Sequence, residues 1–260
     1  MKDYYGWRAR IGLIYMASST VMEPEFYAMA PEGVSIHTDR IVLPAATIEG
    51  LEKMMEGGEV RRCASFLAEA PLHAIMFGGT SATFLHGIGW DRKVIAQMDE
   101  VAHAIPTSTT STASLNALRA VGARKISIVT PYVDAITERA RRFFGDNGFE
   151  VVGSKGLNLD KDRDIGAVAL EAVYAFAKAN CRAGSDALFL SCTNWRTVGA
   201  IEALENDLGI PVISAIQASF WECLRLARVG EARTGFGRLF EHGLSLSQPS
   251  GGAGKKGAAA

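Results

Sequence analysis

Two apolar segments of the chain end in small residues and hydroxyls, and one of them carries a cysteine. Residues 73–81 read HAIMFGGTS, and residues 186–194 read DALFLSCTN. Such endings are typical of buried parallel strands that deliver a loop to a ligand crevice. If the two segments face each other, Cys192 lies opposite Gly79, at an offset of 192 − 79 = 113. One thiol facing a glycine predicts a site that supplies a proton to one side of a ligand only.

A weak internal duplication extends beyond these segments. Three further pairs of landmarks follow in the same order: residues 11–15 with 126–130, Gly33 with Gly148, and Ile105 with Ile210, at offsets of 115, 115 and 105. This order predicts two related halves of about 105–115 residues, a period too long for a solenoid.

The elements that must position these residues alternate between strands and helices. Strands are predicted at residues 10–15, 34–37, 73–78, 103–107, 125–130, 149–153, 186–191 and 210–214. Helices are predicted at residues 48–69 (broken near Gly57), 134–147 (ended by Gly148), 167–179, 197–207 and 219–227.

This alternation predicts an α/β fold of two pseudosymmetric lobes, each a parallel sheet flanked by helices, with the active site between the lobes. We expect the first lobe to comprise residues 1–106 plus 214–246 and the second residues 107–213. Residues 247–260 are rich in glycine and alanine and are predicted to be disordered.

Composition excludes several classes of function. The net charge of −1 provides no basic field for nucleic acid, and no apolar stretch reaches the roughly 18–20 residues that span a bilayer. The N-terminus lacks the apolar region of a signal peptide. The four cysteines show no metal-ligand spacing, so we expect reduced thiols in a cytoplasmic protein without a metal site. No glycine-rich nucleotide motif occurs, and no cofactor is predicted.

Ligands of parallel sheets bind beyond the carboxyl ends of the strands. That rule selects residues 15–20, 79–83, 107–112, 130–132 and 192–197, none of which places a carboxylate at the strand tip. We therefore expect a cleft lined by hydroxyls and amides, suited to an anionic ligand. Cys192 is the candidate catalytic residue, and the candidate substrate-binding residues are Gly79, Thr80, Ser81, Tyr132, Thr193, Tyr15 and Asn194.

Each candidate also has a structural alternative. Thr80 and Ser81 could cap a helix, and a buried thiol could be a packing residue. Tyr15 could serve packing rather than the ligand. Arg196 could pair with a substrate carboxylate or lie on a helix surface.

Several motifs resemble the aspartate/glutamate racemase superfamily, and within it the arylmalonate decarboxylase family most of all. They are residues 79–81 (GTS), 131–134 (PYVD), 191–192 (SC), 208–212 (LGIPV) and 235–240 (GFGRLF). The resemblance runs from about Ile11 to Phe240, while the segment from Ser18 to Glu25 resembles maleate isomerases.

The resemblance implies a cofactor-free, two-lobed enzyme. Racemases and isomerases of this superfamily carry a cysteine at both strand ends, whereas the decarboxylases have glycine at the first, as Gly79 is here. The residues matching Thr80, Ser81, Tyr132 and Cys192, with the backbone amide of Thr193, would bind one carboxylate of a malonate. The other carboxylate would leave an apolar pocket as carbon dioxide, and the cysteine would protonate one face of the resulting enediolate.

These features predict a carboxy-lyase that decarboxylates a malonate-type diacid, including aryl- or alkyl-substituted ones, with a small dicarboxylate as its only expected partner. The alternative is a racemase or maleate-type cis–trans isomerase of a small diacid or amino acid, which would need a second acid–base group opposite Cys192. A third possibility is a carboxylate-binding protein without turnover. Because residues 193–196 (TNWR) stand where the decarboxylases have glycines, we expect a more polar pocket and a smaller or more oxygenated diacid.

Overall fold

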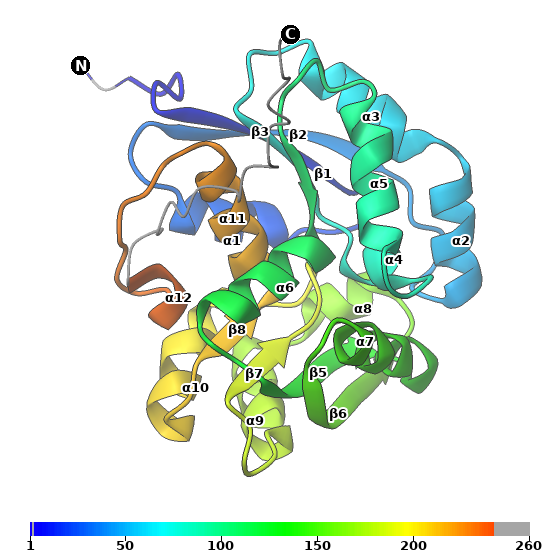
Figure 1. Cartoon of the computed structure of the whole chain (residues 1–260), viewed down its shortest axis with the longest axis vertical. Helices are drawn as coiled ribbons and strands as arrows, with labels where there is room; N and C mark the ends of the chain where they lie inside the picture. Colours follow the sequence, from blue (N-terminus) through cyan, green and yellow to red (C-terminus); the bar gives the residue numbers. More distant parts are fainter. Residues whose placement is uncertain (2, 242–260) are drawn as a thin grey trace, which may run out of the picture.

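The computed structural model describes residue 1 and residues 3–241, and it consists of two α/β lobes (Figure 1). The first sheet has the order β2-β1-β3-β4 and the second the order β6-β5-β7-β8, all strands parallel. The strands are β1 (Ala9–Met16), β2 (Val34–Ile41), β3 (Ala74–Phe77), β4 (Thr107–Thr109), β5 (Lys125–Tyr132), β6 (Glu150–Leu159), β7 (Ala187–Leu190) and β8 (Val212–Ser214). The identical order confirms the predicted fold class.

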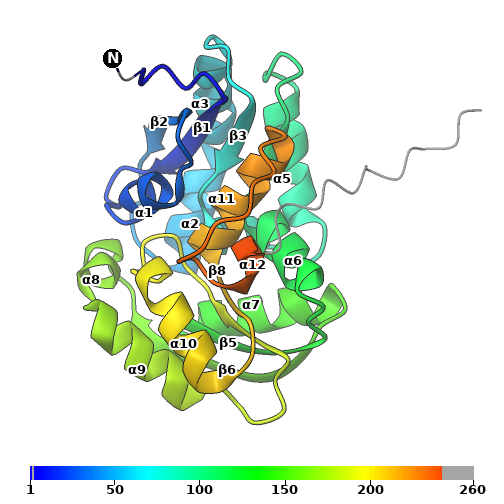
Figure 2. The same ribbon diagram turned by 90° about the vertical axis from the view of Figure 1, so that its left-hand side faces the viewer.

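Helices cover the sheets, and the two lobes lie one above the other in Figures 1 and 2. The helices are α1 (Met22–Met29), α2 (Ile48–Glu56), α3 (Glu59–Ala68), α4 (Thr80–Phe84), α5 (Trp90–Asp99), α6 (Thr110–Ala120), α7 (Asp134–Asp146), α8 (Asp162–Ala167), α9 (Leu170–Asn180), the 3₁₀ helix η1 (Val198–Ala200), α10 (Ile201–Leu208), α11 (Ala215–Leu226) and α12 (Arg238–Glu241).

Glycines end two helices where the sequence predicts. Gly58 (φ +68°) separates α2 from α3, and Gly148 (φ +95°) follows α7, both in the left-handed region that favours glycine. In contrast, α1, α5 and α6 lie in segments where no helix is predicted. Three of the first four residues of α6 are threonine or serine, which are weak helix formers, and the helix is stabilised by packing against α11.

One outer strand of each sheet is longer than predicted. β2 extends to Ile41 rather than residue 37, and β6 extends to Leu159 rather than residue 153. Both strands lie at a sheet edge and are only half-buried, so their polar residues hide the strand pattern. The loops that follow these strands therefore begin later than the sequence predicts. They carry Leu43 and Asp162, which line the pocket described below.

The chain passes from the first sheet to the second between β4 and β5. β4 pairs with β3, so the first sheet continues through Thr109, three residues past the expected boundary at 106. After β8, α11 returns to the first lobe and packs against α1 and α6. The predicted disordered segment, residues 247–260, lies outside the described residues. Within those residues, no helix is both long enough and apolar enough to cross a bilayer.

Candidate active site

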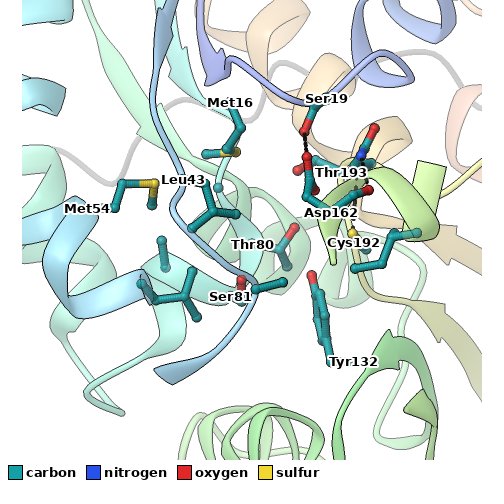
Figure 3. Close-up of a pocket in the computed structure, with 16 residues that line it drawn as sticks. Met16, Ser19, Leu43, Met54, Thr80, Ser81, Tyr132, Asp162, Cys192 and Thr193 are labelled. Atoms are coloured by element: carbon teal, nitrogen blue, oxygen red, sulfur yellow. Dashed lines mark hydrogen bonds between the residues drawn. The ribbon is translucent and has the colours of Figure 1, made fainter. Parts of the chain in front are cut away.

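A narrow pocket lies between the lobes, at the carboxyl ends of the strands of both sheets (Figure 3). It is lined by Met16, Ser19, Leu43, Ala46, Leu51, Met54, Gly79, Thr80, Ser81, Ala82, Tyr132, Asp162, Ile165, Cys192, Thr193 and Asn194. Seven of the eight sequence-predicted site residues meet here, and the eighth, Tyr15, lies behind the pocket wall.

The loop after β7 holds Cys192 in this pocket and is fixed by the opposite lobe. The Thr193 hydroxyl donates to the carbonyl of Gly78 (2.7 Å), which joins the two strand ends directly. The hydroxyl of Tyr15 donates to the carbonyl of Thr193 (2.6 Å) and accepts from the amide of Met22 (3.2 Å). Tyr15 is fully buried and therefore positions the cysteine loop rather than lining the pocket.

The Cys192 thiol is buried, and burial favours its protonated form. Burial raises its pKa to about 12, and the negative charge of Asp162 adds to the shift, while Tyr132 and the amide of Asn194 oppose it. The amide of Asn194 lies 3.3 Å from Sγ and donates to it. A thiol in this state is a proton donor and a poor nucleophile, since the thiolate is the nucleophilic form.

Three hydroxyls converge beside the thiol. Burial raises the pKa of Tyr132 well above its ordinary value, Cys192 raises it further, and the nearby hydroxyls of Thr80 and Ser81 lower it. Thr80 Oγ1 is buried and has no hydrogen-bond partner of good geometry among the described residues. Since buried polar atoms are almost always paired, this oxygen indicates a place for a ligand. Neutral donors of this kind can hold a carboxylate and stabilise added negative charge on it.

Gly79 leaves no thiol on the opposite strand end, and hydrocarbon fills the space. A Cβ at Gly79 would lie 2.7 Å from Cζ of Phe77 and 3.1 Å from Cε of Met16. The position is therefore not an open vacancy, because two side chains of the first lobe occupy it.

Asp162 corrects the expectation of a cleft lined by hydroxyls and amides alone. It is the first residue of α8, after the carboxyl end of β6, and its carboxylate lines the pocket near Cys192 (Figure 3). Oδ2 accepts from the hydroxyls of Ser18 (2.6 Å) and Ser19 (2.8 Å). The signal was present in the sequence, but the expected end of β6 at residue 153 placed Asp162 too far from a strand tip.

The rest of the wall is apolar and was also missed. Leu43 and Ala46 follow β2, and Leu51 and Met54 lie on α2. In Figure 3, Leu43 and Met54 lie on the far side of Thr80 from Cys192. Arg196, the candidate cation, is exposed and does not line the pocket.

Comparisons with known proteins agree with this geometry. The family model described as arylmalonate decarboxylase matches residues 11–240. The chain belongs to the arylmalonate decarboxylase family. It is 34% identical to arylmalonate decarboxylase of Bordetella bronchiseptica over 205 residues, which cover 76% of this chain and 83% of the relative.

Solved structures of two kinds of enzyme resemble this fold. A liganded double mutant of arylmalonate decarboxylase, in which a glycine is replaced by cysteine and a cysteine by serine, superposes with a TM-score of 0.83 at 29% identity, covering 90% of this chain and 99% of that one. A mutant maleate cis–trans isomerase of Nocardia farcinica, in which one cysteine is replaced by serine and which holds a covalently bound succinylcysteine intermediate, gives a TM-score of 0.85 at 26% identity, covering 90% of this chain and 98% of that one. The relatives of this chain therefore include both decarboxylases and isomerases.

Proposed function

We propose that this enzyme is a cofactor-independent carboxy-lyase that decarboxylates a malonate-type diacid and uses Cys192 as the proton donor. One carboxylate of the substrate binds to Thr80, Ser81, Tyr132 and the amide of Thr193. The other carboxylate faces the apolar wall of Leu43, Leu51 and Met54 and is the one that leaves.

The reaction has two steps. The bond between the α-carbon and the outer carboxylate breaks, carbon dioxide leaves, and the electron pair delocalises into the bound carboxylate, which becomes an enediolate. The S–H proton of Cys192 then moves to the α-carbon, and the thiolate regains a proton from solvent. The net reaction consumes one proton and converts a malonate into a monoacid and carbon dioxide. Because charge on the bound carboxylate increases, the hydroxyl donors stabilise the transition state more than the bound substrate.

The observation that carries this proposal is a buried thiol beside three hydroxyls, with no second cysteine in the pocket lining among the described residues. A pKa of about 12 keeps Cys192 protonated over the whole physiological range, as a proton donor requires. The variants solved for arylmalonate decarboxylase exchange one glycine and one cysteine of that enzyme, and we propose that Gly79 and Cys192 are the corresponding pair.

The second candidate function is isomerisation of a small diacid, which the similarity to maleate isomerases favours. A succinylcysteine intermediate contains a bond between sulfur and the substrate, so a thiolate must attack. The raised pKa of Cys192 opposes that role, and no second cysteine lines the pocket in the described part of the chain.

Carbon dioxide release distinguishes the two candidates. We expect the purified enzyme to decarboxylate at least one member of a panel of substituted malonates and to leave maleate unchanged. Cys181→Ser is the matched control, because this half-buried cysteine lies outside the pocket. Conversion of maleate to fumarate without carbon dioxide release from any malonate would support the isomerase instead.

A further inference from the structure

The carboxylate of Asp162 is held in place by both lobes. The hydroxyls of Ser18 and Ser19, from the first lobe, donate to Oδ2, and the side-chain amide of Asn194 donates to the backbone carbonyl of Asp162 (2.8 Å). Asn194 is in turn fixed by the amide of Thr20, which donates to its Oδ1 (3.1 Å). These hydrogen bonds fix the position of the Asp162 side chain in the pocket wall.

The second oxygen of this carboxylate is available to a ligand. Among the described residues, no hydrogen bond is formed to Oδ1, and no lysine, arginine or histidine lines the pocket. Arg40 donates to the carbonyl of Ser19, but its ion pair is with Glu23 and not with Asp162. The pocket wall thus carries a half-buried carboxylate whose charge has no cationic partner among the lining residues.

A ligand that fills the pocket must satisfy this charge. An apolar substituent against Oδ1 would strip water from a carboxylate and give it no partner, which costs free energy. A second carboxylate there would meet like charge at short range. A hydroxyl or an ammonium group would instead donate a hydrogen bond, and the ammonium would also neutralise the charge.

We propose that the substrate carries on its reacting carbon a hydroxyl or ammonium substituent that Asp162 binds. The inference rests on the proposed function for the reaction itself, but the recognition is a property of the pocket. The substrate class is therefore a 2-hydroxy- or 2-aminomalonate rather than an aryl- or alkylmalonate, and Asp162 determines this specificity.

Binding of three matched monoacids tests the recognition without any turnover. Lactate, alanine and isobutyrate differ only in the substituent on the α-carbon: hydroxyl, ammonium or methyl. We expect wild-type enzyme to bind lactate and alanine at least about tenfold more tightly than isobutyrate in calorimetric titrations. Asp162→Val should reverse the order, and Asp162→Asn should keep the preference for lactate while losing that for alanine. Asp164→Asn, an exposed acid on the same helix, is the control and should behave like wild type.

Turnover tests the same preference in the reaction. We expect 2-hydroxy-2-methylmalonate or 2-amino-2-methylmalonate to release carbon dioxide at least about tenfold faster than 2,2-dimethylmalonate. If no malonate is decarboxylated but the monoacid preference holds, the proposed function fails and the inference stands. Equal or tighter binding of isobutyrate by wild type, or no detectable binding of lactate and alanine, overturns the inference.

Discussion

The two lobes share one backbone plan, yet their matched strand ends present opposite chemistry to the pocket. The three pairs are Met16 at the end of β1 and Tyr132 at the end of β5, Leu43 after β2 and Asp162 after β6, and Gly79 after β3 and Cys192 after β7. Every ionisable member of these pairs belongs to the second lobe. The first lobe supplies hydrocarbon and a glycine at the same positions, and adds the hydroxyls of Ser19, Thr80 and Ser81.

The two lobes differ in the side chains at these positions and not in their topology. The ionisable groups therefore lie on one side of the pocket only. A symmetric pair of acids would allow a proton to be removed from one face of a carbon and returned to the other. In the proposed decarboxylation, one donor delivers the proton from one face only, which suits protonation of a carbanion that forms by loss of carbon dioxide. The hydrogen bond from Thr193 to the carbonyl of Gly78 fixes the position of the two strand ends relative to each other.

Removal of the thiol is the largest change we predict. Cys192→Ala should lower the rate of decarboxylation by about 10²–10⁴-fold, the usual contribution of a positioned acid. The measurement is initial-rate carbon dioxide release, with Cys181→Ser as the control that should retain full activity. Retention of more than a tenth of the activity by Cys192→Ala would contradict the assignment of the proton donor.

Removal of the Tyr132 hydroxyl takes away one of the three hydroxyl donors that we propose bind the substrate carboxylate. Tyr132→Phe should lower kcat by about 10²-fold, since loss of one donor to a developing oxyanion typically costs 10²–10³-fold. KM should change much less, because the bond is strongest in the transition state. An increase in KM at constant kcat would show instead that Tyr132 contributes only to substrate binding.

A second thiol at position 79 should make the two sides of the pocket chemically alike. Gly79→Cys places Cβ against Phe77 and Met16, and such overpacking costs about 1–3 kcal/mol of stability. The variant should also lose stereochemical selectivity, because protons can then arrive from both faces. Gly79→Ala introduces the same Cβ without the thiol and separates the two effects: equal loss of selectivity in both variants would rule out a role for the new sulfur.

The half-buried carboxyl of Glu25, which binds the chain just after the loop that carries Cys192, makes the stability of the fold depend on pH. Glu25 Oε1 accepts from the amides of Thr197 and Val198, Oε2 is buried without a partner among the described residues, and burial raises the pKa to about 7. Its contribution is fully present below the unfolded pKa of about 4.5 and is lost as pH rises through about 7, because the unfolded chain ionises first.

Glu25→Gln removes this titration while keeping an acceptor for the two amides. We expect the variant to be more stable than wild type at pH 8 by about 1–2 kcal/mol, after allowance for partial exposure, and equal to it at pH 4. Denaturant unfolding at both pH values measures the difference. Glu32→Gln, at an exposed site, should change neither, and an equal difference at both pH values would contradict the assignment.

The smallest predicted effect on the kinetics is that of replacing Arg196, the cationic residue that the sequence analysis considered as a partner of the substrate carboxylate. Arg196→Gln should change kcat and KM less than about twofold, because the side chain is exposed and lies outside the pocket. A tenfold rise in KM would show that Arg196 reaches the substrate in the bound state.

The sequence predicted the inner strands and most of the polar half of the pocket, because β3 and β7 are short, buried and end in recognisable small residues. It missed Leu43 and Asp162 for a common reason. Both follow edge strands whose polar residues, such as Ser154 and Lys155 of β6, conceal where the strand ends. The packing of Tyr15 behind the pocket could not be read either, since the direction of a buried side chain depends on neighbours from both lobes.

The central claim is that a proton reaches one face of the intermediate from Cys192 alone. The most direct test is the enantiomeric composition of lactate formed from 2-hydroxy-2-methylmalonate, or of alanine formed from 2-amino-2-methylmalonate, by wild-type enzyme. We predict a single enantiomer. A racemic product would contradict the account, because it would require protons to arrive equally from both sides of the pocket.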